Sequence, residues 1–87
     1  MAVLKWVGQK KDPFYITANT DKQGKIVLVG SDPATGYPAV WIEDSIGLKS
    51  QLREFHVIGT GHKIPENCTH VGSFIATPFV WHVYEQL

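Results

Sequence analysis

The sequence has 87 residues, which is enough for one domain but too few for two independent hydrophobic cores. Hydrophobic residues make up 44% of the chain and aromatic residues 11%, so a real but small core is expected rather than intrinsic disorder. Eight basic residues balance eight acidic ones, which gives no long-range attraction to nucleic acid or to an anionic membrane. We expect neither as a partner. Because a small core gains stability from association, we expect a homo-oligomer.

Cys68 is the only cysteine, which excludes an intramolecular disulfide and a zinc site made of thiolates alone. No apolar run approaches the ~20 residues that cross a bilayer, and the start of the chain turns polar too quickly for a signal peptide. These observations predict a single domain over residues 1–87 in a reducing cytoplasm.

Apolar residues alternate with a period of two along most of the chain, which is typical of strands rather than helices. The alternation predicts seven strands that are rich in β-branched or aromatic residues: Val3–Val7, Phe14–Ala18, Lys25–Val29, Ala39–Glu43, Arg53–Ile58, His70–Ile75 and Phe79–Tyr84. Segments containing glycine, proline, aspartate or asparagine separate these strands. The pattern predicts an all-β fold, either a compact small sandwich or a partly open barrel of mainly antiparallel strands.

One stretch, residues 44–52, is ambiguous. Ser45 is a suitable N-cap for a short helix, whereas Gly47 would weaken that helix by roughly 1 kcal/mol relative to alanine. A short helix and a loop both remain open for this stretch.

The strongest candidate binding site is the segment Gly59-Thr60-Gly61-His62-Lys63. Its two glycines allow backbone amides to converge on an anion, and its three other side chains add hydrogen-bond donors. The segment lacks the Gly-x-x-x-x-Gly-Lys-Ser/Thr spacing of a phosphate loop. The alternative interpretation is a connecting turn whose glycines only satisfy backbone geometry.

The four histidines are His56, His62, His70 and His82. None has the i, i+4 or His-x-His spacing that makes metal ligation convincing, so we expect no metal and no cofactor. His56 and His82 alternate with apolar neighbours and would lie on one sheet face if their strands pair. Cys68 and His70 would also share a face, but no oxyanion donor or third orienting residue accompanies them.

The aromatic residues divide into candidates for the core and candidates for recognition. Trp41 and Trp81 lie in apolar strands, and we expect both in the core. Tyr37 lies in a Gly-Tyr-Pro loop, and we expect it to be exposed. A purine could stack on Tyr37 or on Trp6.

The last third of the chain carries a resemblance to a known family. Its segments Phe55-His-Val-Ile-Gly-Thr-Gly-His-Lys-Ile-Pro65, Val71-Gly-Ser73 and Phe79-Val-Trp-His-Val-Tyr-Glu85 resemble those of a family of small bacteriophage proteins of unknown function. Leu4-Lys-Trp6 and Pro38-Ala-Val-Trp41 are also similar to that family. The resemblance implies a phage origin and the cytosol of an infected bacterium, and it brings no catalytic residues.

Small phage β proteins commonly act by stoichiometric binding, and the sequence contains no established catalytic motif. We therefore expect a non-enzymatic protein that counteracts a host function, most specifically by sequestering a nucleotide-like bacterial immune signal. The expected ligand-binding residues are Gly59, Thr60, Gly61, His62, Lys63, Tyr37, Trp6 and His82. Two alternatives are a protein–protein inhibitor of a host enzyme, with an aromatic patch or strand edge, and a small hydrolase using His62 or His82.

Overall fold

The computed structural model describes residues 2–8, 14–18, 24–44 and 51–87. Within these ranges the chain forms strands and no helix, which confirms the all-β prediction. The strands are β1 (Ala2–Val7), β2 (Phe14–Ala18), β3 (Ile26–Ser31), β4 (Pro38–Asp44), β5 (Gln51–Gly59), β6 (Cys68–Ala76) and β7 (Phe79–Gln86). Each coincides with one of the predicted segments, with small shifts at the ends.

The possible helix over residues 44–52 falls mainly on residues 45–50, which lie outside the described residues. The flanks of that stretch are strand, because Asp44 ends β4 and Gln51 begins β5.

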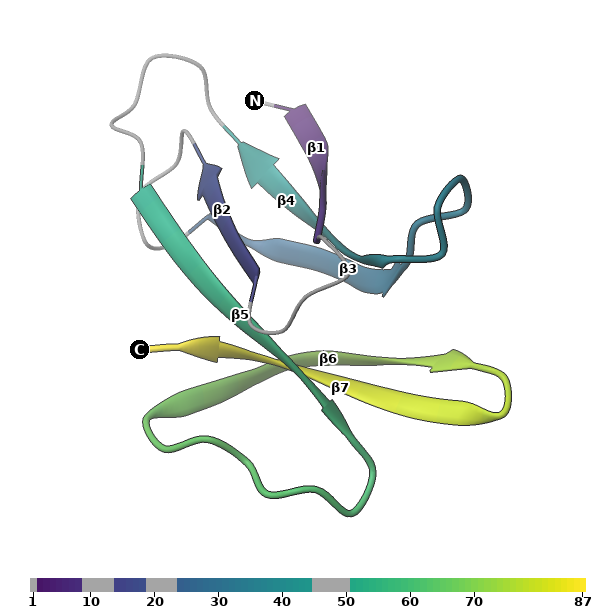
Figure 1. Ribbon diagram of the computed structural model, residues 1–87. Coiled ribbons are helices and arrows are strands. Elements are labelled where there is room, and N and C mark those ends of the chain that lie inside the picture. Colours follow the sequence, from purple (N-terminus) through teal and green to yellow (C-terminus); the bar gives the residue numbers. More distant parts are fainter. Residues whose placement is uncertain (1, 9–13, 19–23, 45–50) are drawn as a thin grey trace.

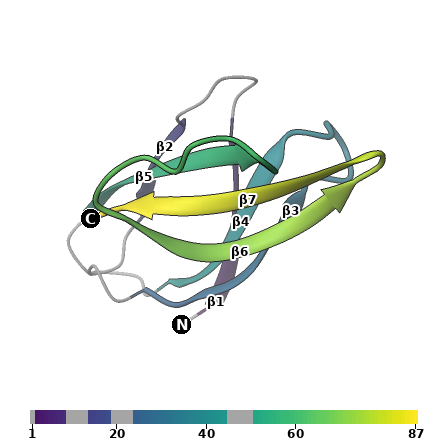
Figure 2. The ribbon, with the colours of Figure 1, turned by 90° about the horizontal axis from the view of Figure 1, so that it is seen from below.

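The strands form two antiparallel sheets (Figure 1). One has three strands in the order β1-β4-β3, and the other has four in the order β2-β5-β7-β6. The first half of β5 pairs with β2 and its second half pairs with β7, so this long strand connects the two ends of its sheet. Seen from below, β6 and β7 cross in front of the three-stranded sheet (Figure 2). The architecture is a small, partly open sandwich.

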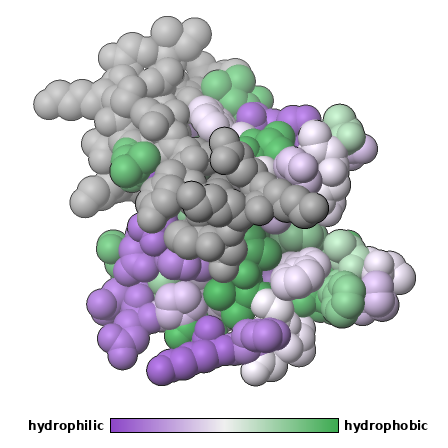
Figure 3. All heavy atoms as spheres, in the orientation of Figure 1, coloured by the Kyte–Doolittle hydropathy of each residue, from purple (hydrophilic) through white to green (hydrophobic). Residues whose placement is uncertain are grey.

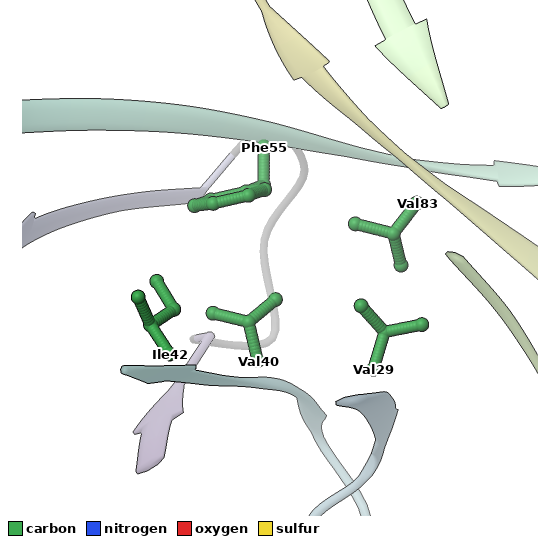
Figure 4. Packing of buried hydrophobic residues seen from close by; sticks show 5 residues of the cluster. All are labelled: Val29, Val40, Ile42, Phe55 and Val83. Carbon is green, nitrogen blue, oxygen red and sulfur yellow. The ribbon is translucent and has the colours of Figure 1, made fainter. Parts of the chain in front are cut away.

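The core lies where the two sheets face each other. Phe55 and Val83 point from the four-stranded sheet toward Val29, Val40 and Ile42 on the three-stranded sheet (Figure 4). All five side chains are buried. Alternation along the strands explains this arrangement, because successive side chains point to opposite faces of a sheet.

The two tryptophans expected in the core are both half-buried and lie outside the central cluster. Val40 and Ile42 point inward, so Trp41 between them lies on the outer face of the three-stranded sheet. Trp81 shares the inner face with Val83 but lies toward the end of the sheet, where its ring centroid is 5.8 Å from that of Phe79. The prediction of a core position is therefore wrong for Trp41, because an apolar strand can also expose one apolar face.

The two sheets approach each other closely at Gly72. A Cβ atom at this position would overlap the side chain of Val29 on β3. The register of β6 against β7 shifts between His70 and Gly72, which leaves Val71 as the extra residue of a β-bulge. Val71 packs partly buried against the core, so the bulge helps β6 to fit onto β3.

A largely buried ion pair joins β5 to β7 within the four-stranded sheet and is linked to the segment before β3. The Arg53 guanidinium donates from Nε and Nη2 to both carboxylate oxygens of Glu85, at 2.6 and 2.7 Å. Its Nη1 donates to the Gly24 carbonyl, which lies just before β3, at 3.0 Å. Paired hydrogen bonds of this kind offset part of the cost of removing both charges from water.

Candidate functional site

The segment that begins at Gly59 is a tight turn at the end of β5, as one of the two sequence interpretations expects. The His62 amide donates to the Gly59 carbonyl at 3.1 Å. Gly61 has a φ of 90°, which fits a type II turn with glycine at its third position. The two glycines thus have a geometric role in the backbone.

The turn places its side chains on opposite faces of the sheet. Thr60 lies on the outer face, where its hydroxyl donates to the Val80 carbonyl at 3.2 Å. His62 lies on the inner side, since a Cβ at Gly59 would be 3.1 Å from His62 Cδ2 and 3.3 Å from the Trp81 ring. The predicted anion site requires the side chains of Thr60 and His62 to point to the same place. In the structure they point to opposite faces of the sheet.

On the outer face, Thr60 begins a relay of hydrogen bonds that runs from the turn after β5 to β7 and β6. The Thr60 hydroxyl lies 3.0 Å from His82 Nε2, and the Ser73 hydroxyl lies 2.8 Å from His82 Nδ1. The relay continues to His70, whose Nε2 lies 2.9 Å from Ser73 Oγ. Thr60, Ser73 and His70 are exposed and His82 is half-buried, so solvent reaches the relay.

The Val80 carbonyl sets the direction of this relay, because a carbonyl can only accept. With the Thr60 hydroxyl proton directed at Val80, the tautomer that fits this contact has the His82 proton on Nε2, from where it is donated to Thr60. A neutral His82 then has a bare Nδ1, which accepts the proton of Ser73. Ser73 Oγ in turn accepts from His70 Nε2.

The β-bulge makes this arrangement possible. Residues three apart in a regular strand point to opposite faces, so His70 and Ser73 would be separated. With Val71 as the extra residue, His70 lies opposite Tyr84 and Ser73 lies opposite His82, all on the outer face. Sequence reasoning missed Ser73 for this reason. The alternation of β7 does indicate that His82 and Tyr84 share a face.

Tyr84 completes the outer face beside the relay. It lies between His56 on β5 and His70 on β6 in the strand register. The Tyr84 and His70 ring centroids are 5.2 Å apart, and the rings are tilted by 59°. His56 and His82 do share one sheet face, as predicted, and they are offset by one register position on that face.

A second polar cluster lies next to the relay. His56 Nε2 is 2.9 Å from Glu54 Oε2 and 3.2 Å from Gln86 Oε1. The Cys68 thiol donates to the same Gln86 oxygen at 3.4 Å. Burial of the thiol, and then the nearby Glu54 carboxylate, raise the pKa of Cys68.

Cys68 and His70 do lie on one face, but the structure gives no support to a nucleophilic pair. His70 Nε2 contacts Ser73, and the raised pKa of Cys68 keeps the thiol protonated at neutral pH. Among the described residues, no group of three or more histidine, cysteine, aspartate or glutamate side chains is placed to hold a metal ion.

Two predicted site residues lie in the other sheet. Trp6 on β1 packs half-buried against the core. Tyr37 is exposed, as expected, in the loop between β3 and β4, which Figure 1 shows well separated from the turn after β5. Asp32 fixes this loop by accepting hydrogen bonds from Lys5 Nζ and from Thr35, and the bond from Lys5 lowers the pKa of Asp32. Of the predicted residues, the structure brings Thr60 and His82 together.

The outer faces of the two sheets differ in chemistry. The outer face of the three-stranded sheet exposes Val3, Val7 and Leu28 around the half-buried Trp41. The four-stranded sheet presents imidazole, hydroxyl and phenol groups, together with the exposed side chains of Leu52, Ile75 and Val80. Figure 3 shows hydrophilic residues gathered at the lower left, over the loop between β5 and β6 and the adjoining strand ends.

Comparisons with known proteins give a family without an assigned activity. Within the described residues, no helix has the length and apolar character needed to span a membrane. No curated protein and no solved structure matches the chain. A domain of unknown function, DUF7352, matches residues 8–87, which include the turn and the whole relay. The chain therefore belongs to the DUF7352 family.

Proposed function

We propose that the protein is a non-enzymatic binding protein that takes up a nucleotide-like small molecule on the outer face of the four-stranded sheet. The observation that supports this proposal is the solvent-exposed relay of Thr60, His82, Ser73 and His70. Imidazoles and hydroxyls can each donate and accept, which suits phosphate oxygens and ribose hydroxyls alike.

Charge and ring surface near the relay fit the same class of ligand. Lys63 lies three residues after Thr60, immediately past the turn, is exposed, and forms no ion pair with another described residue. Its ammonium group is therefore available for a phosphate. The Tyr84 ring beside His70 provides a surface on which a base can stack. In this proposal Tyr84 takes the stacking role that the sequence suggested for Tyr37 or Trp6.

The resemblance to small phage proteins suggests a biological role for this binding. In that role the protein acts in the host cytoplasm and sequesters a nucleotide signal of bacterial immunity, with one ligand bound at each site. Sequestration requires no oxyanion hole and no metal, only binding tighter than that of the host receptor.

Calorimetric titration with cyclic nucleotides and ADP-ribose derivatives tests the proposal. We expect heat of binding for at least one ligand, and chromatography should recover that ligand intact. Lys63→Gln should weaken binding about tenfold, equivalent to about 1.4 kcal/mol. Lys25→Gln is the matched control, because Lys25 is also exposed but lies before β3. No heat with any ligand would refute the proposal, whereas turnover of the ligand would favour the hydrolase.

A second candidate function is inhibition of a host enzyme by direct contact. The outer face of the three-stranded sheet favours it, because Val3, Val7 and Leu28 are exposed there around Lys5 and Trp41. Exposed apolar residues gathered on one face often mark protein interaction sites. The same face could pair two copies of the chain into the expected homo-oligomer. Leu28→Glu should abolish stoichiometric capture of a host protein if the face is inhibitory, and should reduce the molar mass in light scattering if it joins copies.

A further inference from the structure

The Ser73 hydroxyl lies between two imidazoles, 2.8 Å from His82 Nδ1 and 2.9 Å from His70 Nε2. We infer that Ser73 is a nucleophile that accepts the acyl or phosphonyl group of an activated ester or fluoride. This inference goes beyond nucleotide binding and does not depend on it. Sequence reasoning considered His82 for hydrolysis but had no nucleophile to pair with it.

The contacts of His82 match the arrangement of a nucleophile, a base and an orienting group. In the tautomer with its proton on Nε2, His82 accepts the Ser73 proton at Nδ1, 2.8 Å away, which makes His82 the base. Thr60 accepts from His82 Nε2 and is itself fixed by its bond to the Val80 carbonyl. Thr60 therefore holds the imidazole in the tautomer that leaves Nδ1 free to take a proton. Its hydroxyl is neutral, so it orients the ring without the charge that a carboxylate would add.

The covalent step balances without any further reagent. Ser73 Oγ attacks the carbonyl carbon or phosphorus atom as its proton moves to His82 Nδ1, and the bond to the leaving group breaks. The leaving group departs with its electron pair, as fluoride or as an alkoxide that takes the proton from His82. The Nε2–H of His70 donates to Ser73 Oγ and so holds the hydroxyl oxygen in place, with its second lone pair left for the attack.

We expect one modification per site rather than turnover. Ser73 lies inside β6, opposite His82 of β7. It does not follow a sharp strand-to-helix turn of the kind that supplies oxyanion donors in esterases. Without those donors, attack by water on the modified serine should be slow, and the adduct should accumulate.

The test is labelling of the whole chain with an alkyl fluorophosphonate, followed by intact mass measurement and peptide mapping. We expect one adduct, on Ser73, formed at least about 100-fold faster than any adduct on Ser31, which is the advantage typical of a positioned base. Ser31 is the internal control because its hydroxyl donates to the Gly36 carbonyl instead. Ser73→Ala should abolish the adduct, and Ser31→Ala should leave it unchanged.

Two further variants separate chemistry from packing. His82→Gln should lower the labelling rate about 100-fold. Thr60→Val should lower it less, and Thr60→Ser, which restores a hydroxyl, should recover most of the rate. Circular dichroism identifies any variant that fails to fold, and the Ser31 comparison within the wild-type chain needs no variant. No adduct on Ser73, or equal rates at Ser73 and Ser31, would overturn the inference. Nucleotide titration of the unlabelled wild-type protein tests the binding proposal separately, so its outcome distinguishes a failure of that proposal from a failure of this inference.

Discussion

The inner and outer faces of the four-stranded sheet are built by the same strands but have different roles. Along β7, Val83 points inward and is fully buried, whereas His82 and Tyr84 on either side of it point outward. The inner face joins the two sheets through shape and apolar contact. The outer face arranges polar groups that solvent can reach. Because successive residues of a strand point to opposite faces, even a very small domain can bury one face of a sheet for stability and keep reactive groups on the other.

The two faces also differ in how their polar groups are hydrogen-bonded. On the inner face, Arg53 is 6% exposed and has both its charge and its donors satisfied by Glu85 and the Gly24 carbonyl. A buried charge without such partners would cost several kcal/mol. On the outer face, water can replace any lost partner of the relay. Substitutions on the inner face should therefore cost stability, and those on the outer face should mainly change reactivity.

The largest expected effect is that of Phe55→Ala. Phe55 is fully buried in the central cluster, so its truncation should lower the free energy of unfolding by about 3–5 kcal/mol. Phe79→Ala is the matched control, because Phe79 is 59% exposed and should cost less than about 1 kcal/mol. Urea denaturation followed by tryptophan fluorescence measures both. Similar losses for the two variants would contradict the placement of the core.

A smaller effect is expected for Gly72→Ala, which tests the contact between the sheets. The added methyl group would overlap Val29, so β6 must move away from β3 at a cost of about 1–3 kcal/mol. At Gly30 an added Cβ would lie 3.8 Å from the Trp41 ring, which is an ordinary contact. Gly30→Ala should therefore be neutral or slightly stabilising. Equal effects at both glycines would show that the sheets pack elsewhere.

The strands were predictable from the sequence because their apolar residues alternate and turn residues separate them. Two features were not. In β4, Val40 and Ile42 point inward and Trp41 points outward, although all three are apolar. When both faces of a strand carry apolar residues, alternation alone does not say which face is buried. The bulge at Val71 changes the face of every later residue in β6, and the sequence around Gly72 gives no local signal for it.

The site was predictable only in part, for the same physical reason. Local sequence identified the turn at Gly59 and the shared sheet face of His56 and His82. It could not show that Thr60 and His62 point to opposite faces, because that depends on how the turn closes against Val80 and Trp81. Ser73 was missed because its face depends on the bulge. The face on which such a residue lies depends on how strands far apart in the sequence pair. The apolar period of a single strand does not predict that pairing.

The smallest expected change in stability belongs to the outer face. Ser73→Ala should alter the free energy of unfolding by about 0.5 kcal/mol or less, because Ser73 is exposed and water can replace its bonds. The same variant should still leave His82 with its proton on Nε2, since Thr60 and the Val80 carbonyl dictate that tautomer. Thr60→Val removes this constraint and should produce a mixture of tautomers. Long-range ¹H–¹⁵N NMR spectra of the imidazoles report the tautomer directly. A proton on His82 Nδ1 in the neutral wild-type protein would reverse the relay and remove the base from Ser73.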